Sequence, residues 1–544
     1  MARLMGQTMQ RPLLISSLLT HAARHHSDTE IVSRRVEGDV HRYTYHDAEP
    51  RARRLAQALQ RLDCPPGERV GTIAWNGYRH LELYYAVAGS GRVCHTINAR
   101  LPPAQLAWMI NHAEDRVLCF DLGFLPLVEK IAPQLETVRH YVLMTDRAHM
   151  PVHTQLPRLL CYEALVEAED GDWQWPEFDE NTASGLCYTT GTTEHPRGAL
   201  YSHRSTVLHS YAAALPGALG CSAQDAILSV LPMSHVNGWG VPHVAPLAGA
   251  KLVFPGPQLD GRSLYELCEA EQVTFCAGVP AVMVGIVNHM QQKGLRFGSL
   301  RRTVLAGSAC PAELIRSLED ELHVGVTQAW GMTELSPLGT VSSLKAPHLA
   351  LPAERQRRLR QKQGRAVCGI DIEIVGDDGE RLPWDGRTAG NLMVRGHWVV
   401  ERHFKSEAAA LQDGWFPTGD VATIDPDGFM ELTDRTRDMI KSGGEWISAA
   451  DLEDIAAEHP AVQEVAAIGC RHPKWGERPL LVVVRRPGAS LLCDELLESY
   501  EGRIPRWQIP DDVVFVSELP HTPGGKVNKH KLREMLGDYA LPTD

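Results

Sequence analysis

The sequence predicts an α/β protein with a large N-terminal domain, made of α/β subdomains and a β-rich subdomain, and a small α+β lobe at its C-terminal end. The chain has 544 residues, more than a single hydrophobic core usually accommodates. Strand-like and helix-like segments alternate through most of it, which is typical of a sheet covered by helices. The pattern changes near residue 364 and again near the C-terminus, so we expect domains at 1–436 and 437–544.

Amphipathic and apolar patterns place the first elements. Leucines at helical spacing predict a helix over residues 47–62, and an apolar helix over 81–88 ends at a Gly-Ser-Gly sequence. Residues 67–75 predict a turn followed by a strand. Further strands are expected at 93–97, 116–120 and 140–144, and the proline-rich, acidic residues 151–180 are expected to form a surface connection.

The alternation resumes after residue 198 and then gives way to two other patterns. Residues 353–362 are strongly basic, which favours a helix with a solvated face over a binding surface. Asp-Gly turns between short strands predict a β-rich subdomain over about 364–433. The remaining expected strands are 226–231, 251–254, 273–275, 303–306, 326–328, 464–468, 480–484 and 513–516, and the remaining helices are 263–271, 281–292, 312–322, 451–458 and 493–500.

Composition excludes several classes of function. The formal net charge is −13, which argues against a nucleic-acid partner. The 12 cysteines include no Cys-x-x-Cys pair, which argues against a zinc ribbon or a disulfide framework and suits a reducing cytoplasm. No apolar run approaches the roughly 20 residues that cross a membrane, and the apolar residues 13–19 lack a signal-peptide cleavage site. We therefore expect a cytoplasmic protein that is not transmembrane.

One loop has the composition of a phosphate-binding site. Residues 188–198 have the sequence Tyr-Thr-Thr-Gly-Thr-Thr-Glu-His-Pro-Arg-Gly and follow a short, mildly apolar segment. Hydroxyl groups, exposed backbone N–H groups and the positive charge of Arg197 together can surround phosphate oxygens. The loop does not match Gly-x-x-x-x-Gly-Lys-Ser/Thr, the sequence of a Walker A loop. Composition alone leaves open a solvated, threonine-rich turn.

Two further segments carry groups suited to a nucleotide. Residues 328–334, Gln-Ala-Trp-Gly-Met-Thr-Glu, follow an expected strand; Trp330 can stack on a purine and Glu334 can bind Mg²⁺. Residues 415–420 end in Asp420 after a Thr-Gly turn, and one carboxylate can accept hydrogen bonds from both ribose hydroxyls. The alternatives are a core tryptophan, a helix N-terminal charge and an ordinary turn aspartate.

Two segments near the C-terminus combine basic residues with glycines. Residues 434–446, Asp-Arg-Thr-Arg-Asp-Met-Ile-Lys-Ser-Gly-Gly-Glu-Trp, contain a Gly-Gly pair whose backbone another molecule can approach closely. Residues 519–529, Leu-Pro-His-Thr-Pro-Gly-Gly-Lys-Val-Asn-Lys, place Lys526 in a glycine-rich turn. Taken singly, such a lysine is usually only solvated.

In this order, the segments resemble the motifs of the adenylate-forming (AMP-binding, ANL) superfamily. That superfamily contains acyl-CoA synthetases, luciferases and peptide-synthetase adenylation domains. The resemblance spans Tyr188 to Lys529, and it implies the adenylating-enzyme fold with a mobile C-terminal domain. This chain departs from the motifs with Glu194 for Gly, Arg197 for Lys and Trp330 for Tyr.

The resemblance implies a role for each motif residue. Lys526 is expected to be catalytic, Arg437 to be the hinge, and Glu334 with Thr189 to bind Mg²⁺. The residues expected to bind ATP or AMP are Thr189, Thr190, Gly191, Thr192, Thr193, Arg197, Gly307, Ser308, Ala309, Gln328, Ala329, Trp330, Gly331, Met332, Thr333, Asp420 and Arg435. Those expected to bind CoA are Lys441, Ser442, Gly443, Gly444 and Trp446.

Residues 231–240, Leu-Pro-Met-Ser-His-Val-Asn-Gly-Trp-Gly, resemble the superfamily's Pro-Met-Phe-His segment, with Ser234 for Phe. By this resemblance His235 is catalytic and borders the acyl carboxylate. The residues expected to contact the acyl group are His235, Val236, Trp239, Gly240, Val279, Ala306 and Gly307. None of them is Arg or Lys, so the expected acid has one carboxylate and is largely apolar.

Residues 330–340, 441–448 and 472–479 further resemble the bacterial medium- and long-chain fatty acyl-CoA synthetases, and within them the 3-methylmercaptopropionyl-CoA ligases. This implies that a carboxylic acid, ATP and CoA give acyl-CoA, AMP and diphosphate. The specific candidate acid is 3-(methylthio)propanoate, and a medium- or long-chain fatty acid is the alternative. An enzyme that loads a carrier protein, a luciferase-like oxygenase and a noncatalytic nucleotide sensor stay open. A homodimer is expected.

Overall fold

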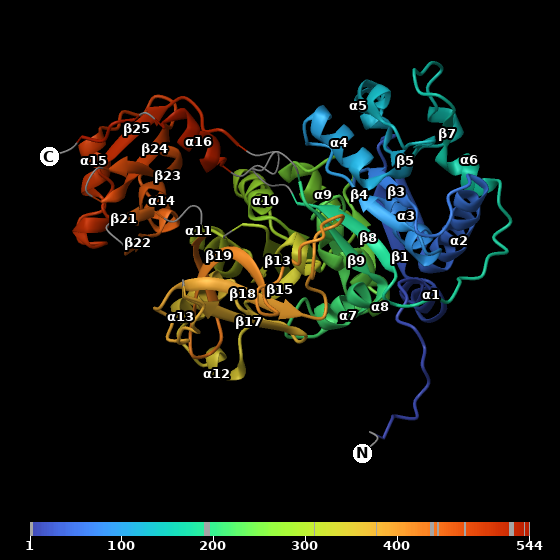
Figure 1. Ribbon diagram of the computed structural model, residues 1–544, viewed down its shortest axis with the longest axis horizontal. Coiled ribbons are helices and arrows are strands. Elements are labelled where there is room, and N and C mark those ends of the chain that lie inside the picture. Colours follow the sequence, from blue (N-terminus) through green and yellow to red (C-terminus); the bar gives the residue numbers. More distant parts are fainter. Residues whose placement is uncertain are drawn as a thin grey trace. The chain divides into compact units, whose positions relative to one another are not determined.

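The computed structural model describes residues 4–189, 196–308, 310–376, 378–435, 440–442, 445–472, 475–521, 527–537 and 539–542. The described chain divides into two compact units, whose elements are labelled in Figure 1. The first unit comprises the chain up to Thr189, Pro196–Asp371 and Arg395–Gly414. The second comprises Ile372–Val394 and the chain from Trp415 onward.

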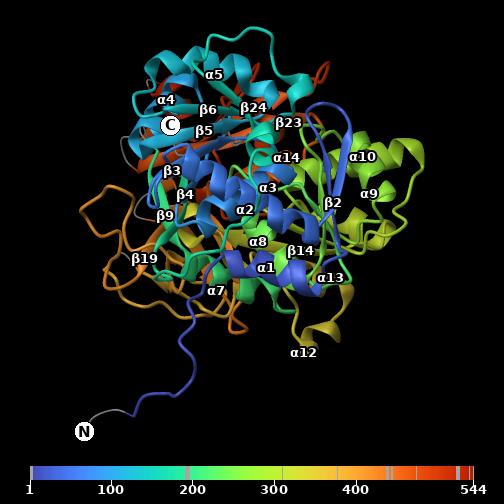
Figure 2. The same cartoon turned by 90° about the vertical axis from the view of Figure 1, so that its right-hand side faces the viewer.

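A largely parallel sheet in the first unit has the strand order β7-β6-β5-β3-β4-β8-β9. Only the β8–β9 pair among its described strands is antiparallel, and it forms a hairpin. Helices α4 and α5 lie on one side of these strands and α2 and α3 on the other (Figure 2). The bounds are β3 Arg69–Ile73, β4 Val93–Thr96, β5 Asp115–Phe120, β6 His140–Leu143, β7 Leu159–Cys161, β8 Ala183–Tyr188, β9 Gly198–Ser202, α2 Tyr45–Arg61, α3 Tyr78–Gly89, α4 Pro103–Ala113, α5 Leu125–Ile131 and α6 Tyr162–Glu167.

A second sheet in the same unit has the order β16-β15-β14-β13-β12-β10-β11-β1-β2. The strands from β14 to β1 in that order run parallel. The β1–β2, β14–β15 and β15–β16 pairs are antiparallel, and β2 and β16 form the two edges. The bounds are β1 Glu30–Arg34, β2 Val40–Thr44, β10 Ala226–Ser229, β11 Lys251–Phe254, β12 Phe275–Gly278, β13 Arg302–Ala306, β14 Gly325–Gly331, β15 Leu338–Val341 and β16 Arg365–Ala366. The helices are α1 Ser16–His25, α7 His203–Ala214, α8 Val241–Ala248, α9 Gly261–Ala270, α10 Pro280–Lys293, α11 Ala312–Arg316, α12 Ala346–Leu349 and α13 Ala353–Gln361.

The strand order of this second sheet reverses at β10 and β12. The chain passes from β10 to β11 on one side of β10 and then to β12 on its other side. In open α/β sheets, ligands bind outside the carboxyl ends of the two strands that flank such a reversal. The segments that follow β10 and β12 are therefore where the fold favours a binding site.

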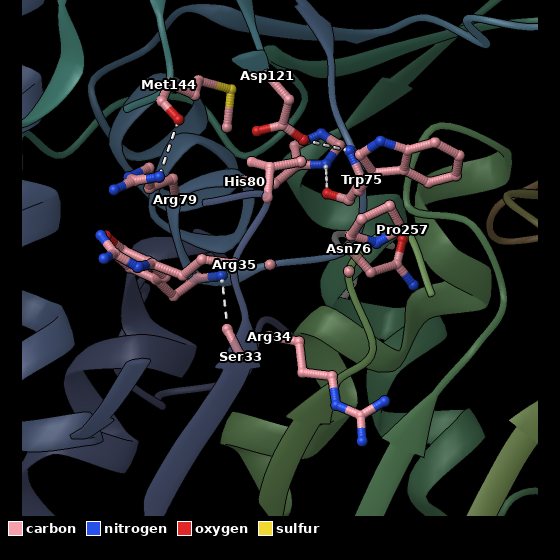
Figure 3. Close-up of a pocket in the computed structure, with 14 residues that line it drawn as sticks. Ser33, Arg34, Arg35, Trp75, Asn76, Arg79, His80, Asp121, Met144 and Pro257 are labelled. Carbon is pink, nitrogen blue, oxygen red and sulfur yellow. Dashed lines mark hydrogen bonds between the residues drawn. The ribbon is translucent and has the colours of Figure 1, made fainter. Parts of the chain in front are cut away.

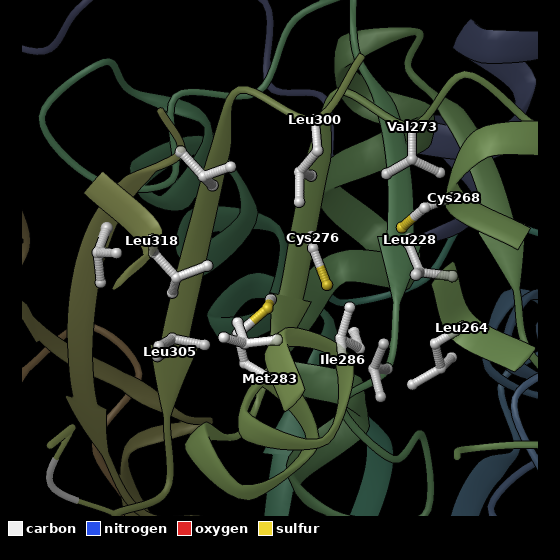
Figure 4. Packing of buried hydrophobic residues seen from close by; sticks show 14 of the residues in the cluster. Leu228, Leu264, Cys268, Val273, Cys276, Met283, Ile286, Leu300, Leu305 and Leu318 are labelled. Atoms are coloured by element: carbon white, nitrogen blue, oxygen red, sulfur yellow. The ribbon is translucent and has the colours of Figure 1, made fainter. Parts of the chain in front are cut away.

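Apolar side chains fix one face of the second sheet against α9, α10 and α11 (Figure 4). Leu264 of α9 and Met283 and Ile286 of α10 are at most 1% exposed and pack with Cys276 and Leu305 from the strands. Strands buried in this way are apolar along their whole length. Polar chemistry is consequently left to the strand ends.

The second unit contains most of an antiparallel sheet, ordered β17-β18-β19-β20. Its bounds are β17 Ile370–Val375, β18 Gly390–Gly396, β19 Phe416–Ile424 and β20 Met430–Arg435. The predicted Asp-Gly turn at 427–428 connects β19 to β20, with Gly428 at a φ of +85° and its N–H donating to the Asp425 carbonyl at 2.8 Å. Positive φ is the conformation that glycine tolerates best.

The C-terminal lobe is a sheet ordered β22-β21-β24-β23, with β25 paired to β24. Alternation along β24 builds two cores, because successive side chains of a strand face opposite sides. Leu481 and Val483 pack with α14 and α15, whereas Leu480 and Val482 pack with α16. The bounds are β21 Ile440–Ser442, β22 Glu445–Ile447, β23 Val462–His472, β24 Gly476–Arg485, β25 Asp512–Val516, α14 Ala449–Ala457, α15 Cys493–Glu498 and α16 Lys529–Met535.

The predicted α/β fold with a small α+β lobe is confirmed, as is the solvated helix α13, which has no buried residue. The expectation for residues 151–180 is wrong in part, because β7 and α6 lie within them and Tyr162 is fully buried. Elements of three and six residues are too short to show a period. Leu18 and Leu19 of the apolar N-terminal segment belong to the core. Among the described helices, none is long and apolar enough to cross a membrane.

Candidate active site

The β8–β9 hairpin fixes the base of the predicted phosphate loop. The Thr189 N–H donates to the Arg197 carbonyl at 2.9 Å, and the Arg197 N–H donates to the Thr189 hydroxyl at 3.1 Å. Arg197 itself is exposed. The predicted contacts Thr190, Gly191, Thr192 and Thr193, together with Glu194, lie outside the described residues.

Glu334 lies in the short 3-10 helix η6 (Thr333–Leu335) and is 7% exposed. Its Oε1 accepts a hydrogen bond from His403 Nε2 at 3.2 Å, and its carbonyl accepts one from the Val400 N–H at 2.9 Å. The Tyr201 hydroxyl, on β9, donates to the Thr333 carbonyl at 2.6 Å. The structure therefore ties the predicted magnesium ligand to the strand that leaves the phosphate loop.

The donor set fits Mg²⁺ in a nucleotide-dependent site. Within the described residues, no group of three His, Cys, Asp or Glu side chains could hold a metal ion. Magnesium is usually held by one or two carboxylates together with phosphate oxygens and water rather than by a full protein cage. A single buried carboxylate beside the phosphate hairpin meets that requirement.

Protein contacts fix the predicted adenine segment. Gln328 Nε2 donates to the carbonyls of Arg360 and Gln361 at 3.2 and 2.6 Å, and its Oε1 accepts from the Cys310 N–H at 3.3 Å. Trp330 is 7% exposed, and a side chain at Gly339 would meet its ring at 2.6 Å. The other predicted residues of the segment are Ala329, which is buried, and Gly331 and Met332, which are half-buried.

The predicted acyl residues follow the strands that flank the reversal of strand order. His235, after β10, is half-buried, and Val279, after β12, is half-buried too. Ala306 ends β13 and is fully buried. Gly307 has a φ of +89°, and a side chain there would lie 3.6 Å from Val279 Cγ1. The structure thus brings Val279 and Gly307 side by side, with the exposed Ser308 next in the chain; Ala309 is not described.

A left-handed turn follows His235. Val236, Asn237, Gly238, Trp239 and Gly240 all have positive φ, from 43° to 78°. Left-handed backbone costs a non-glycine residue about 1–2 kcal/mol, so surrounding contacts must hold this turn. The Cys187 thiol of β8 donates to Asn237 Oδ1 at 3.3 Å.

Two residues that sequence reasoning missed support this turn and the segment 229–233 that leads to it. Asn76 follows β3 of the other sheet; its Nδ2 donates to the carbonyls of Ser229 and Leu231, both at 2.8 Å, and its Oδ1 accepts from the Met233 N–H at 2.7 Å. The second is His209 of α7, which is 1% exposed. Its Nε2 accepts from the Leu338 N–H at 3.4 Å, and its ring lies against Gly240. Only the fold reveals contacts between residues so far apart in the chain.

In the second unit, β19 and β20 pair the two predicted ribose contacts. Asp420, which is half-buried, and Arg435 are Cα partners across the antiparallel ladder. The Asp420 N–H donates to the Thr418 hydroxyl at 3.1 Å. The predicted hinge Arg437 lies outside the described residues.

The predicted CoA segment forms the β21–β22 hairpin, in which Lys441 pairs with Trp446. Ser442 is 5% exposed, and its hydroxyl accepts from Arg478 Nη1 at 3.2 Å. Gly443 and Gly444 are not among the described residues, and neither is Lys526. An antiparallel bridge between His521 and Val527 closes the base of the lysine loop.

A separate small pocket lies at the carboxyl ends of β1, β3, β5, β6 and β11 (Figure 3). Arg79 donates there to the Met144 carbonyl at 2.9 Å and to Glu163 and Glu37. Asp121 accepts from the Trp75 N–H at 2.7 Å, and burial raises the pKa of Asp121 to about 7. The space there for water-sized molecules is about 30 Å³, enough for one or two waters. It is too small for any of the expected substrates.

Comparison with known protein families covers most of the chain. The family described as AMP-binding enzyme matches residues 19–403. The family described as AMP-binding enzyme C-terminal domain matches residues 451–526.

Individual proteins are similar over nearly the full length. A 3-methylmercaptopropionyl-CoA ligase of Ruegeria lacuscaerulensis is 52% identical over 98% of this chain and 99% of its own. A medium-chain-fatty-acid–CoA ligase of Ectopseudomonas oleovorans is 50% identical over 99% and 98%. Among solved structures, an anthranilate CoA ligase in complex with anthranoyl-AMP has a TM-score of 0.83 at 21% identity, covering 97% and 98% of the two chains. That last similarity shows the fold.

Proposed function

Because this chain belongs to the family of AMP-binding enzymes and is an ATP-dependent acid–CoA ligase, we propose that its substrate is a short- to medium-chain, apolar monocarboxylic acid, specifically 3-(methylthio)propanoate. The observation that carries the choice of acid is the end-to-end similarity to the Ruegeria ligase. The similarity to the Ectopseudomonas ligase, almost as high, favours a medium-chain fatty acid as the second candidate.

The described walls of the acyl region support an apolar acid with one carboxylate. Trp239 is 5% exposed, Ala306 is fully buried, and Val279 borders Gly307. None of these residues carries a charge that would compensate a second carboxylate, and burying an unpaired charge is costly. The half-buried His235 is the polar group proposed to border the reacting carboxylate.

In the proposed first step, a carboxylate oxygen attacks the α-phosphorus of ATP. The new O–P bond forms as the bond to the β-phosphate breaks, which gives acyl-AMP and diphosphate. Positioning and charge neutralisation dominate such reactions. Arg197 and the threonines of the phosphate loop are proposed to hold the β- and γ-phosphates, and Lys526 to stabilise the charge that develops on the reacting oxygens.

Glu334 would hold Mg²⁺, with Thr189 as the second proposed contact. The ion supplies neutralisation of charge on the phosphate oxygens. Trp330 is proposed to contact adenine, and Asp420 with Arg435 to contact the ribose. The register that pairs these last two residues across β19 and β20 supports their common role.

In the proposed second step, the CoA thiolate attacks the acyl carbonyl carbon; the C–S bond forms, the C–O bond to AMP breaks, and AMP leaves. We place the domain boundary at residue 436 and the pivot at Arg437. Rotation of the lobe would replace Lys526 at the acyl-AMP by the hairpin that carries Ser442, Gly443 and Gly444, a lid-type conformational step.

The choice of acid is tested with ATP, Mg²⁺, CoA and a panel of acids from acetate through 3-(methylthio)propanoate and octanoate to palmitate. AMP release and thioester are both measured, so that hydrolysis of acyl-AMP is distinguished from ligation. We expect the highest kcat/KM for 3-(methylthio)propanoate. A preference for octanoate would select the medium-chain alternative.

The role of Lys526 is tested by Lys526→Ala, with the exposed Lys531 as matched control. Loss of a charge that stabilises the transition state costs about 10²–10³ in kcat, so adenylation should fall by about that factor in Lys526→Ala and stay unchanged in Lys531→Ala. Adenylation at the wild-type rate in Lys526→Ala would refute the assignment.

Assembly and location complete the proposal. We propose a homodimer, which sedimentation equilibrium tests directly; a monomer at micromolar concentration would refute it. We also propose action in the cytoplasm, since the twelve cysteines are free thiols, the usual state in a reducing compartment. Fractionation of cells that express the tagged chain tests the location.

A further inference from the structure

Residues 398–404, which we call the strap, connect two parts of the proposed active site. On one side the strap bonds to the η6–β15 segment: the Ser336 hydroxyl donates to the Trp398 carbonyl, and Trp398 Nε1 donates to the Leu338 carbonyl, both at 2.9 Å. On the other side the Phe404 N–H donates to the Gly198 carbonyl at 2.7 Å. Gly198 is the first residue of β9, so the strap joins β9 to the segment of Glu334.

The strap holds Glu334 at both its backbone and its side chain. The Val400 N–H donates to the Glu334 carbonyl at 2.9 Å, and His403 Nε2 lies 3.2 Å from Glu334 Oε1. An ionised carboxylate only accepts hydrogen bonds, so Nε2 of His403 must carry the proton. The side chains of His403 and Glu334 are 13% and 10% exposed, so little water competes for this bond.

The bond to His403 leaves one carboxylate oxygen for another partner. Among the described residues, Glu334 Oε2 makes no hydrogen bond. With Oε1 fixed by the imidazole and the backbone fixed by Val400, the direction of Oε2 is determined. Loss of a residue that orients a metal ligand in this way typically lowers metal affinity or activity about 10- to 100-fold.

We propose that His403 is a positioning residue that orients the Glu334 carboxylate toward the magnesium ion of bound ATP, and that the strap fixes Glu334 relative to the start of β9. This rests on the proposed role of Glu334. The imidazole makes no contact with substrate in this assignment; it acts through the carboxylate. Its loss should therefore affect the part of ATP affinity that depends on Mg²⁺.

The test measures ATP binding by calorimetry without acid or CoA, once with Mg²⁺ and once with EDTA. We expect His403→Leu to weaken binding about 10- to 100-fold in Mg²⁺ and to leave binding in EDTA unchanged. His403→Gln, whose amide nitrogen can approach the position of Nε2, should recover most of the loss. His153→Leu, at an exposed histidine in the loop between β6 and β7, is the matched control and should match the wild type in both buffers.

Two results would overturn the inference: equal weakening in both buffers, which a purely structural role gives, or no weakening in Mg²⁺. Glu334→Gln separates this inference from the proposed function. If Glu334→Gln keeps full Mg²⁺-dependent affinity, the role of Glu334 is wrong; if it loses that affinity while His403→Leu does not, only the role of His403 is wrong. Should His403→Leu not fold, His403→Asn, whose amide is too short to reach, gives the same two readings.

Discussion

Replacing Gly240 by alanine should disrupt the acyl end of the site for two reasons, backbone strain at a positive φ and a steric clash with His209. Gly240 has a φ of +78°, and its added Cβ would lie 2.5 Å from Cε1 and 3.0 Å from Nδ1 of His209. Left-handed backbone costs about 1–2 kcal/mol, and overpacking a core costs about 1–3 kcal/mol. The expected loss in the free energy of unfolding is therefore about 2–5 kcal/mol.

A double-mutant cycle with His209→Ala measures the steric part alone. Burial lowers the pKa of His209 to about 4, so the ring is neutral at pH 7 and its removal takes away no charge. The methyl group that Gly240→Ala adds fits into the space that the ring leaves, whereas the backbone cost persists. The double variant should thus be more stable than the sum of the single variants by about 1–3 kcal/mol.

The wild type, the two single variants and the double variant are compared by thermal unfolding and by the Michaelis constants for the acid and for ATP. Gly240→Ala should raise KM for the acid more than KM for ATP, because Gly240 follows Trp239 in the turn that carries predicted acyl residues. Addition of His209→Ala should bring KM for the acid partly back. Strictly additive free energies, or a change in KM for ATP alone, would refute the steric reasoning.

Two further predictions concern other parts of the chain. Arg478 binds Asp511 through two nitrogens and donates to the Ser442 hydroxyl, and a lysine cannot reproduce that fork. Arg478→Lys should therefore slow thioester formation from preformed acyl-AMP roughly 10- to 100-fold, with adenylation little changed. Equal slowing of both half-reactions would contradict this prediction. The pKa of Asp121 is raised by burial to about 7. The Asp121 carboxyl therefore keeps its proton in the folded state at pH values where the unfolded chain has released it, above about pH 4. As a result, the free energy of unfolding of the wild type falls as the pH rises from about 4 toward 7. Between pH 5 and pH 8, the free energy of unfolding of Asp121→Asn should rise by about 3 kcal/mol relative to that of the wild type. If the difference in stability between the two proteins is the same at both pH values, the prediction is refuted.

Local patterns were sufficient for most of the elements, and the proposed nucleotide residues rest on the order of the motifs. The helix predicted at 47–62 is α2, and the strands predicted at 93–97 and 251–254 are β4 and β11. Hydrophobic period and turn residues act over a few positions, so a single sequence contains them. The positioning of Glu334 by His403 spans 69 positions and that of Met233 by Asn76 spans 157. No helix or strand period predicts that His403 contacts Glu334 or that Asn76 contacts Met233, because these pairs are so far apart in the sequence.

The hairpin of β8 and β9 shows why acid and nucleotide chemistry depend on one scaffold. Cys187 of β8 holds Asn237 in the left-handed turn beyond His235, and Tyr201 of β9 holds the Thr333 carbonyl beside Glu334. The phosphate loop connects these same two strands. A displacement of the hairpin therefore shifts the proposed acyl and magnesium residues together, whereas a change in one arm alone, such as loss of the Tyr201 hydroxyl, should affect ATP binding before it affects the acid.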